Sequence, residues 1–342
     1  MLADGKPGHY HQAEGVIAAI GRVRPVITTR LEVRRRFVVP TRTLAQLVNL
    51  GVPPSLVLRL GFGIRAESLP AADVVVSAGG ETLAANAAVA KVLGAANIFC
   101  GRLRRLRPEH VQLVIVSLER FGELPNHLVS LPPSPIDIRP AASGSGAGRV
   151  VRYGRTNPPG RVGMLIGGNS GAHRFGAEDW SQLTRFLHDA HHSHGIRWLA
   201  ATSRRSGSAI GDALAAMAAK GKGGLDTFID FRTAGPGTLP QIFSAADAIL
   251  CTDDSTTMIS EAVGARLPVV SVTPAASALE GREAEYRAFL ASESWYRSLA
   301  LSELTPDTFL AALEEITPRT SSQLDELAAA VSGRLPELFA RP

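Results

Sequence analysis

A cluster of hydroxyl and carboxylate residues follows an apolar run late in the sequence. In the stretch CTDDSTTMISEAVGARLPVV, Asp254, Ser255 and Thr256 open a predicted helix, and Glu261 lies one and a half turns into it. Asp254 or Ser255 would cap that helix, and its first backbone amides would attract an anion. A carboxylate at position 261 could accept two hydrogen bonds from a ribose diol. Spacing alone leaves two interpretations open, an ordinary capped helix and a nucleotide pocket.

Two other loops of the same half carry groups suited to phosphate. In ATSRRSGSA, Ser203 could cap a helix whose positive end Arg204 and Arg205 would share. A cation is unfavourable there unless an anion binds beside it. The alternative is that both arginines point into solvent. In GGNSGAH, Gly168 and Asn169 follow a predicted buried strand, and glycine lets the backbone approach a ligand.

The first half contains two comparable loops, DGKPGHYHQ and SAGGET. Their glycines would leave backbone amides accessible, and their polar side chains stand close to a helix start. A glycine turn with a helix cap explains the same pattern equally well. The residues singled out in these loops are Asp4, Gly5, Lys6, Gly8, His9, Gln12, Gly79, Gly80 and Glu81.

No metal site is predicted. His188 and His192 stand four residues apart, but no carboxylate or cysteine converges on them in the sequence. Cys100 and Cys251 each end an apolar run and are expected to be buried thiols of a protein in the reducing cytoplasm. The sequence shows neither a secretory signal nor an apolar run of membrane-spanning length.

Positive charge is concentrated in the first 150 residues, which hold 18 lysines and arginines against 10 acidic residues; the remainder holds 18 against 21. The excess lies in RVRPVITTRLEVRRRF and GRLRRLRP. Such a surface could face an anionic membrane, or it could simply be arginine-rich and solvated. Nucleic acid is not expected, because no aromatic residues are interleaved with these runs. The sequence predicts no oligomeric state.

Strands and helices alternate through short loops along most of the chain. In the second half, the segments RVGMLI, IRWLAATS, LDTFIDF, AILCTD and PVVSV are predicted to be strands separated by helices, which is typical of a parallel sheet covered on both faces. The first half shows strands at RPVITTRLEV, ADVVVSA, ANIFC and VQLVIVS. We therefore predict an α/β protein of two Rossmann-like domains facing a cleft, with C-terminal helices.

Composition predicts the domain boundaries. The N-terminal α/β domain is predicted for 1–135, a linker rich in Pro, Gly and Ser for 136–160, and the second Rossmann-like domain for 161–304. Two amphipathic helices are predicted in 305–342. Because ligands bind at the carboxyl ends of parallel strands, the loops that follow strands are expected to carry the chemistry.

Three segments together resemble the marker segments of a known family. DGKPGHYHQAEG, ATSRRS and CTDDSTTMISEAVGARLPVV, in this order, resemble those of the mitochondrial-fission elongated-mitochondria protein family, many bacterial members of which are described as glycosyltransferases. The last segment is also similar to the nucleotide-sugar loop of GT-B glycosyltransferases. The resemblance spans residues 4 to about 272. It implies that 161–304 bind a nucleotide sugar and that the terminal helices pack back toward the N-terminal domain.

The resemblance also implies roles for single residues. Glu261 would hold the ribose hydroxyls of a nucleotide such as UDP, and Ser255 with Thr256 would meet its diphosphate. The complete predicted donor site is Gly168, Asn169, Ser203, Arg204, Asp254, Ser255, Thr256 and Glu261. Asp4, His9 and Glu81 are the candidates for a base that deprotonates the acceptor, and the other residues of the two N-terminal loops would form the acceptor side. No cofactor is implied, since the nucleotide-diphosphate sugar is the substrate.

The leading interpretation is therefore transfer of a sugar from a nucleotide-diphosphate sugar to a hydroxyl acceptor, which could be lipid-linked. The protein itself is expected in the cytoplasm, where it could be peripheral to the inner membrane. The alternatives are a non-catalytic GT-B-shaped scaffold related to fission factors, and a nucleotide-sugar epimerase of the same fold. The sequence departs from the family in two places: only three residues precede DGKPG, and SLER (117–120) replaces a Pro-x-His-Asp turn. The second departure removes two candidate polar groups from the acceptor side. Neither the sugar nor the acceptor is predicted.

Overall fold

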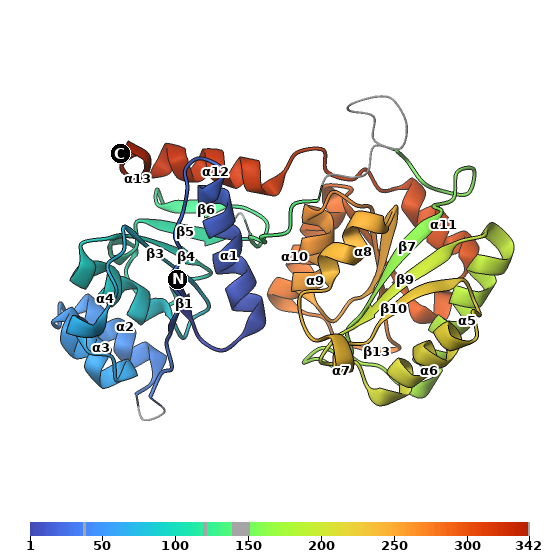
Figure 1. Cartoon of the computed structure of the whole chain (residues 1–342), viewed down its shortest axis with the longest axis horizontal. Helices are drawn as coiled ribbons and strands as arrows, with labels where there is room; N and C mark the ends of the chain where they lie inside the picture. The colour runs from blue at the N-terminus through green and yellow to red at the C-terminus, as the bar shows by residue number, and fades with distance from the viewer. Residues whose placement is uncertain (37–38, 119–121, 139–150, 341–342) are drawn as a thin grey trace. The chain divides into compact units, whose positions relative to one another are not determined.

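The structure is a computed structural model, and Figure 1 labels its helices and strands. None of the described helices is long and apolar enough to cross a membrane. Part of the SLER segment (119–120) and part of the predicted linker (139–150) lie outside the described residues. The structure describes residues 1–36, 39–118, 122–138 and 151–340.

The chain divides into two compact units. Unit 2 is the continuous stretch Ile138–Ser322, whereas unit 1 combines Met1–Asp137 with the C-terminal residues Gln323–Pro342. Each unit has its own sheet of parallel strands. The predicted class, an α/β protein of two Rossmann-like domains with C-terminal helices, is confirmed.

Unit 2 is built on a six-stranded parallel sheet with the order β10-β9-β7-β11-β12-β14. Counted along the unit, this is the order 3-2-1-4-5-6 of doubly wound nucleotide-binding folds. The order reverses between β7 and β11, and ligands of such sheets bind at this switch point, beyond the carboxyl ends of the strands. The strands are β7 (Arg161–Ile166), β9 (Arg197–Thr202), β10 (Leu225–Ile229), β11 (Ala248–Thr252), β12 (Val269–Thr273) and β14 (Tyr296–Ala300).

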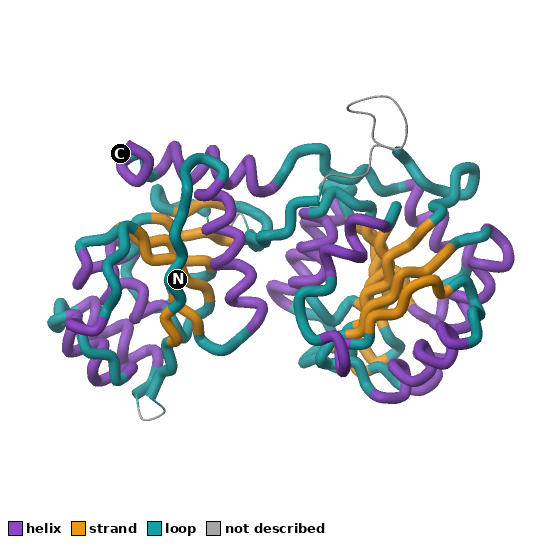
Figure 2. Tube along the Cα trace, in the orientation of Figure 1, coloured by secondary structure: helices purple, strands orange, loops and turns teal. Residues whose placement is uncertain are grey.

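Helices flank this sheet on both faces (Figure 2), which is why its central strands are apolar along almost their whole length. An antiparallel pair of short strands, β8 (His173–Arg174) and β13 (Ala276–Ser277), joins the loops that follow β7 and β12. The helices are α5 (Ala177–His194), α6 (Ser208–Ala219), α7 (Phe231–Ala234), α8 (Leu239–Ala245), α9 (Thr256–Gly264), α10 (Gly281–Ser292) and α11 (Pro306–Glu314).

The core of unit 2 lies between this sheet and the helices α5 and α11. Leu183 and Leu187 on α5 are fully buried against it, as their helical spacing predicts. Trp198 of β9 is also fully buried, and its indole Nε1 donates a hydrogen bond to the carbonyl of Leu187 at 3.0 Å. The largest buried side chain therefore has its one polar atom satisfied.

Unit 1 contains a four-stranded parallel sheet with the order β3-β4-β5-β6 and a separate parallel pair, β1 and β2. The strands are β1 (Leu2–Ala3), β2 (Leu31–Glu32), β3 (Val74–Ala78), β4 (Ala96–Cys100), β5 (Leu113–Val116) and β6 (His127–Val129). The helices are α1 (Pro7–Gly21), α2 (Thr41–Asn49), α3 (Pro54–Phe62), α4 (Leu83–Leu93), α12 (Gln323–Arg334) and α13 (Glu337–Ala340).

One segment of unit 1 that was predicted to be a strand forms a strand only at its end. Of RPVITTRLEV, only Leu31–Glu32 pairs with β1, whereas Ile27 is 98% exposed. Pro25 has no backbone N–H to donate to a neighbouring strand. The β-branched composition therefore overstated the strand, because β propensity is only realised where the side chains find a surface to pack on.

The two terminal helices belong to different units. The prediction grouped them, but α11 stays in unit 2, where Phe309 and Leu313 join its core. The helix α12 instead packs against α1 of unit 1, with Leu327 and Val331 buried. Gln323 begins α12 and donates hydrogen bonds from Nε2 to the carbonyls of Leu131 and Pro132 at 3.0 and 2.9 Å.

Candidate functional site

The switch point of unit 2 brings three of the predicted loops together. The backbone N–H of Gly167, just past β7, donates to Thr252 Oγ1 at 2.7 Å, and that hydroxyl donates to Asp254 Oδ1 at 2.6 Å. A Cβ on Gly167 would lie 2.0 Å from Asp254 Oδ1, and one on Gly168 would lie 2.0 Å from the carbonyl oxygen of Arg205. The close approach of the loops therefore requires both glycines.

The ATSRRS loop is fixed at this point by Ser206. Its Oγ lies 2.7 Å from the carbonyl oxygens of both Ile166 and Gly167, and it also accepts a bond from the backbone N–H of Ser203 at 2.9 Å. Arg205 Nη2 lies 2.6 Å from Asp254 Oδ2. The Asp254 carboxylate has no solvent exposure, whereas 40% of the Arg205 side chain is exposed. One cation thus stands at the mouth of the switch point, compensated by a buried anion.

Of the two adjacent arginines, Arg205 and not Arg204 contacts Asp254. Arg204, assigned to the donor pocket by resemblance, is exposed, and Arg205 is the arginine that reaches Asp254. The sequence signal for both was the same, a positive pair beside a helix start. Which of two adjacent arginines faces the sheet depends on the loop conformation, which Ser206 sets through its bonds to the end of β7.

The helix α9 begins at this site. Ser255 is its N-cap, and the side chain accepts a bond from the backbone N–H of Met258 at 3.4 Å. Thr256 Oγ1 accepts from Arg287 Nη1 at 2.9 Å. Glu261 is buried, with 4% of its surface exposed. An ordinary surface glutamate is therefore excluded, because a buried carboxylate is costly unless it is compensated.

The paired aspartates have different surroundings. Asp253 is 1% exposed and points into a buried network, not toward the switch point. It accepts hydrogen bonds from Ser271 Oγ at 2.8 Å and from Tyr296 OH at 2.6 Å, while Arg287 Nε lies 3.0 Å from both of its oxygens. The imidazole Nε2 of His173 lies 3.4 Å away. Asp253 therefore joins β11, β12, β14 and α10 beneath the site.

Electrostatics keep Asp253 ionised in this position. Burial alone would raise the pKa of its carboxyl, but His173, the Arg287 charge and the hydroxyls of Tyr296 and Ser271 together hold the pKa below its usual value. Arg287 also donates from Nη2 to the Asp253 carbonyl at 2.7 Å. The guanidinium thus links the start of α9 to α10.

Unit 1 has a second polar site, at the carboxyl ends of β1 and β3. His9 Nδ1 lies 2.7 Å from Asp4 Oδ2, and the Asp4 side chain is almost completely buried. Lys6 Nζ donates to Glu81 Oε1 at 3.2 Å. Gly79 has φ +84°, and a Cβ there would lie 2.2 Å from the His9 ring, so the imidazole fits only against glycine.

These contacts unite residues that the sequence could only propose separately. Asp4, Lys6, His9, Gly79 and Glu81 come from two loops about 70 positions apart, and the structure places them in contact. Gly5 supplies a second left-handed turn at φ +83°. Gly8 and Gln12 lie in the first turns of α1.

Metal ligands and reactive thiols are not features of the described sites. In residues 1–36, 39–118, 122–138 and 151–340, no group of three or more His, Cys, Asp or Glu side chains could hold a metal ion. His188 and His192 stack with ring centroids 6.4 Å apart on α5. Cys100 and Cys251 are buried free thiols, and burial raises the pKa of Cys100 to about 12. Neither is suited to act as a nucleophile at neutral pH.

Several solved structures are similar to this chain along nearly its whole length. MurG of Acinetobacter baumannii shares 14% identity with a TM-score of 0.47, covering 97% of this chain and 98% of its own. The E. coli ADP-heptose LPS heptosyltransferase II shares 14%, with a TM-score of 0.44 and coverage of 96% and 98%. Arabidopsis thaliana UGT89C1, complexed with quercetin, shares 12%, with a TM-score of 0.49 and coverage of 99% and 97%.

At such identities these similarities do not transfer an activity. No curated protein sequence matches the chain. The sequence profile described as Mitochondrial fission ELM1 matches residues 7–335, which is nearly the whole chain. The match includes the second and third marker segments completely and the first from Pro7 onward. The chain therefore belongs to the mitochondrial fission ELM1 family.

Proposed function

We propose that the protein binds a nucleotide-diphosphate sugar at the switch point of unit 2 and transfers the sugar to a hydroxyl acceptor. The observation that carries the proposal is the convergence of the Gly167–Gly168 backbone, Arg205 and the N-terminus of α9 at that point. Each is a group that binds phosphate, and a helix N-terminus with an arginine can neutralise a departing diphosphate without a metal.

In this proposal Glu261 binds the ribose. It lies on α9, the helix whose N-terminus would meet the diphosphate, and its burial sets it apart from a solvated helix residue. A carboxylate accepts from both hydroxyls of a ribose diol. Asp254 holds Arg205 at the mouth of the site and would share it with the incoming phosphates.

His9 is the base that the geometry of unit 1 favours. Asp4 is buried and held against His9 Nδ1, and Glu81 is paired with Lys6. The Asp4 carboxylate would orient the ring so that Nε2 takes the acceptor proton. The acceptor oxygen then bonds to the anomeric carbon as the bond to the diphosphate oxygen breaks, and the nucleoside diphosphate leaves with the electron pair.

A thermal-shift panel of UDP, GDP, dTDP and ADP, with and without sugars, tests donor binding. A ligand that binds only the folded protein raises its stability in proportion to the logarithm of its concentration. Stabilisation by one nucleoside diphosphate supports the transferase. If none stabilises the protein, the second candidate stands, a binding protein without transfer chemistry, which the fission role in the family description favours. Epimerisation of the sugar without an acceptor would identify the third candidate, a nucleotide-sugar epimerase.

Replacing Glu261 with Ala is expected to weaken binding of the stabilising nucleotide by about 1.5–3 kcal/mol, the cost of losing hydrogen bonds to a charged group. Isothermal titration at pH 7 measures this. Glu178→Ala on α5 is the matched control, since that glutamate is exposed. The affinity of this variant for the nucleotide should equal that of the wild-type protein. An unchanged affinity for Glu261→Ala in a folded protein would remove Glu261 from the ribose site.

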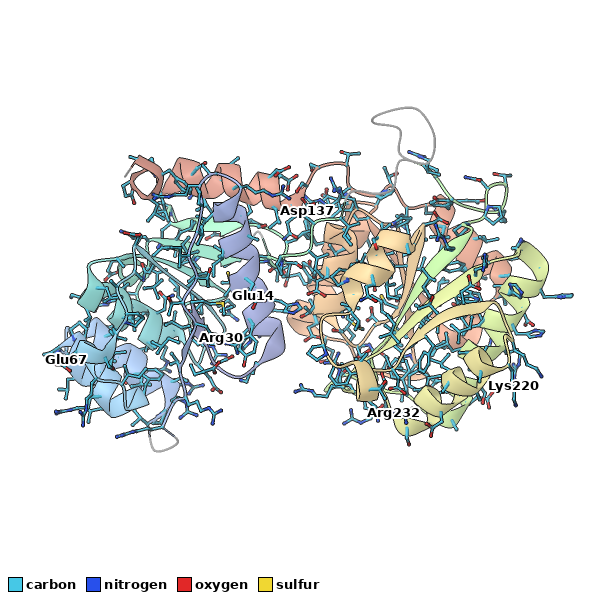
Figure 3. All side chains as sticks on the ribbon, in the orientation of Figure 1. Glu14, Arg30, Glu67, Asp137, Lys220 and Arg232 are labelled. Atoms are coloured by element: carbon cyan, nitrogen blue, oxygen red, sulfur yellow. The ribbon has the colours of Figure 1, made fainter. Side chains whose placement is uncertain are left out.

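Membrane contact and a cytoplasmic location remain predictions. Within unit 1, Arg22 pairs with Asp137 and Asp325, and Arg24 donates to the carbonyl of Leu338 at 2.6 Å (Figure 3 labels Asp137). Two of the cations expected to face anionic lipid therefore already have partners in the chain. Sedimentation with phosphatidylglycerol vesicles at two salt concentrations tests the idea, because binding of basic residues to anionic lipid weakens with salt.

A further inference from the structure

A small recess in unit 1 is lined by three arginines. It lies where α2 and α4 begin, beside the Gly80–Glu81 loop, and Arg42, Arg104 and Arg105 contribute to its wall. Its internal volume is about 20 Å³. A single water needs roughly 10–15 Å³ on this measure, so the interior has room for one or two water-sized groups, and a larger group would lie at the mouth among the arginines.

The three arginines have no anionic partner in the part of the chain that the structure describes. None of them forms an ion pair with a carboxylate of those residues. The one acidic residue of the recess, Glu81, is paired with Lys6 at 3.2 Å. The three arginines are exposed, and the mouth of the recess therefore carries a positive charge that no carboxylate of the described residues compensates.

The loop that carries Arg104 and Arg105 is held in a constrained conformation. Arg104 adopts φ +53°, a conformation that non-glycine residues rarely occupy. Its guanidinium lies against the backbone of Gly80, where a Cβ would be 2.8 Å from the guanidinium carbon. Asn49 holds the loop from both sides, donating to the Arg105 carbonyl at 2.8 Å and accepting from the Arg107 N–H at 3.0 Å.

Arg42 stands in the first turn of α2, where the helix dipole disfavours a cation. An anion bound in the recess would make this arrangement favourable, because both the arginines and the first backbone amides of α2 would attract it. Gly80 follows Gly79, and the His9 ring packs against Gly79. The recess is thus next to the proposed base.

We propose that this recess binds a phosphoryl group carried by the acceptor, so that the acceptor is a phosphorylated molecule whose reacting hydroxyl lies near His9. This rests on the proposed function and narrows its acceptor class. Guanidinium groups bind phosphate oxygens bidentately, so the arginines would meet the oxygens of a phosphoryl group at the mouth of the recess. The group can come from a soluble phosphate ester or from a prenyl diphosphate in a membrane.

Arginine modification by phenylglyoxal, read residue by residue by mass spectrometry of the full chain, tests the proposal. Inorganic pyrophosphate is the soluble probe, and a prenyl diphosphate in phosphatidylcholine vesicles is the membrane probe. At about ten times the dissociation constant, either probe should slow modification of Arg104 and Arg105 about tenfold. Protection by pyrophosphate indicates a soluble ester suffices; protection by the vesicle probe alone indicates a membrane source. Phosphatidylcholine vesicles without the prenyl lipid should give none.

Arg104→Gln should raise the pyrophosphate concentration that half-protects Arg105 about tenfold, the loss of one charge-assisted contact. Arg65→Gln is the matched control, an exposed arginine of the same unit outside the recess, and should leave that concentration unchanged. No protection by either probe, or equal protection of Arg65 and Arg104, overturns the proposal. Protection of Arg205 by UDP tests the donor site in the same experiment. A failure of the proposed donor site can therefore be told apart from a failure of the proposed phosphoryl site.

Discussion

At the scale of single residues, adjacent side chains of one motif do different work. Asp254 faces the switch point with Arg205, while Asp253 compensates Arg287 in the interior. Two adjacent residues of one polar motif therefore have different roles: Asp254 belongs to the candidate site, and Asp253 stabilises the structure beneath it. Function and stability should accordingly respond to different substitutions within it.

Asp253→Asn is expected to destabilise unit 2 by about 3–5 kcal/mol, because it leaves the Arg287 cation buried without its partner. Urea unfolding at pH 7 measures the change. The exposed pair Arg232 and Asp212 (Figure 3 labels Arg232) provides the control. Asp212→Asn should cost under about 1 kcal/mol. Similar losses in both variants would contradict the buried role of Asp253.

The buried pair of Asp253 and Arg287 also predicts that stability depends on pH. The folded-state pKa of Asp253 is held below its usual value, so its contribution to stability is present above the unfolded pKa of about 3.9 and is lost as pH falls through the folded value. Wild-type unfolding free energy should therefore decrease below about pH 4 more steeply than that of Asp253→Asn. Equal slopes in the two proteins would show that Asp253 titrates alike in both states.

Gly79 allows a second comparison between matched residues. Gly79→Ala must pay for φ +84° and for a clash with the His9 ring, whereas Gly51→Ala at φ +74° meets nothing within 4 Å. We expect a loss of about 1 kcal/mol for Gly51→Ala and about 2–3 kcal/mol for Gly79→Ala. Urea unfolding measures both, and an equal loss would mean that His9 moves away without cost.

At the scale of elements, the sequence predicts what local pattern controls. The strands β7, β9, β11 and β12 of unit 2 were predictable because both of their faces are buried and their apolar runs are continuous. The edge strand β14, which is only partly buried, was not predicted. The β2 strand was overestimated because Val26 and Ile27 have strand propensity but no surface to cover them. Burial depends on partners distant in the sequence, and no window of residues contains that information.

The same limit applies to the two polar sites. The loops following β1, β3, β7, β9 and β11 were identified from glycine and capping patterns, which are local. The position of Glu261 in the interior, the choice of Arg205 over Arg204 and the Asp4–His9 contact were not predictable, since each depends on contacts between separate loops. The recess in unit 1 joins Arg42 to Arg104 and Arg105 of the basic run GRLRRLRP, and nothing in the sequence links that run to Arg42.

At the scale of the whole molecule, unit 1 is assembled from both ends of the chain. The core it shares with α12 includes Val16 and Ile20 of α1 and Leu327 and Val331 of α12, all buried. Among the residues that the structure describes, the core of unit 2 contains none from unit 1. The two units should therefore differ in whether a continuous piece of chain can fold.

We expect the fragment 138–322 to unfold cooperatively on its own, whereas 1–137 should not, because α1 would expose the apolar face that α12 covers. A peptide of residues 323–342 added to 1–137 should restore cooperative unfolding, followed by circular dichroism during urea titration. The same peptide carrying Leu327→Asp and Val331→Asp should have no effect, since charges cannot enter that face. Cooperative unfolding of 1–137 without any peptide would show that unit 1 folds without α12. Residues beyond 322 would then be dispensable for holding the Asp4–His9 pair.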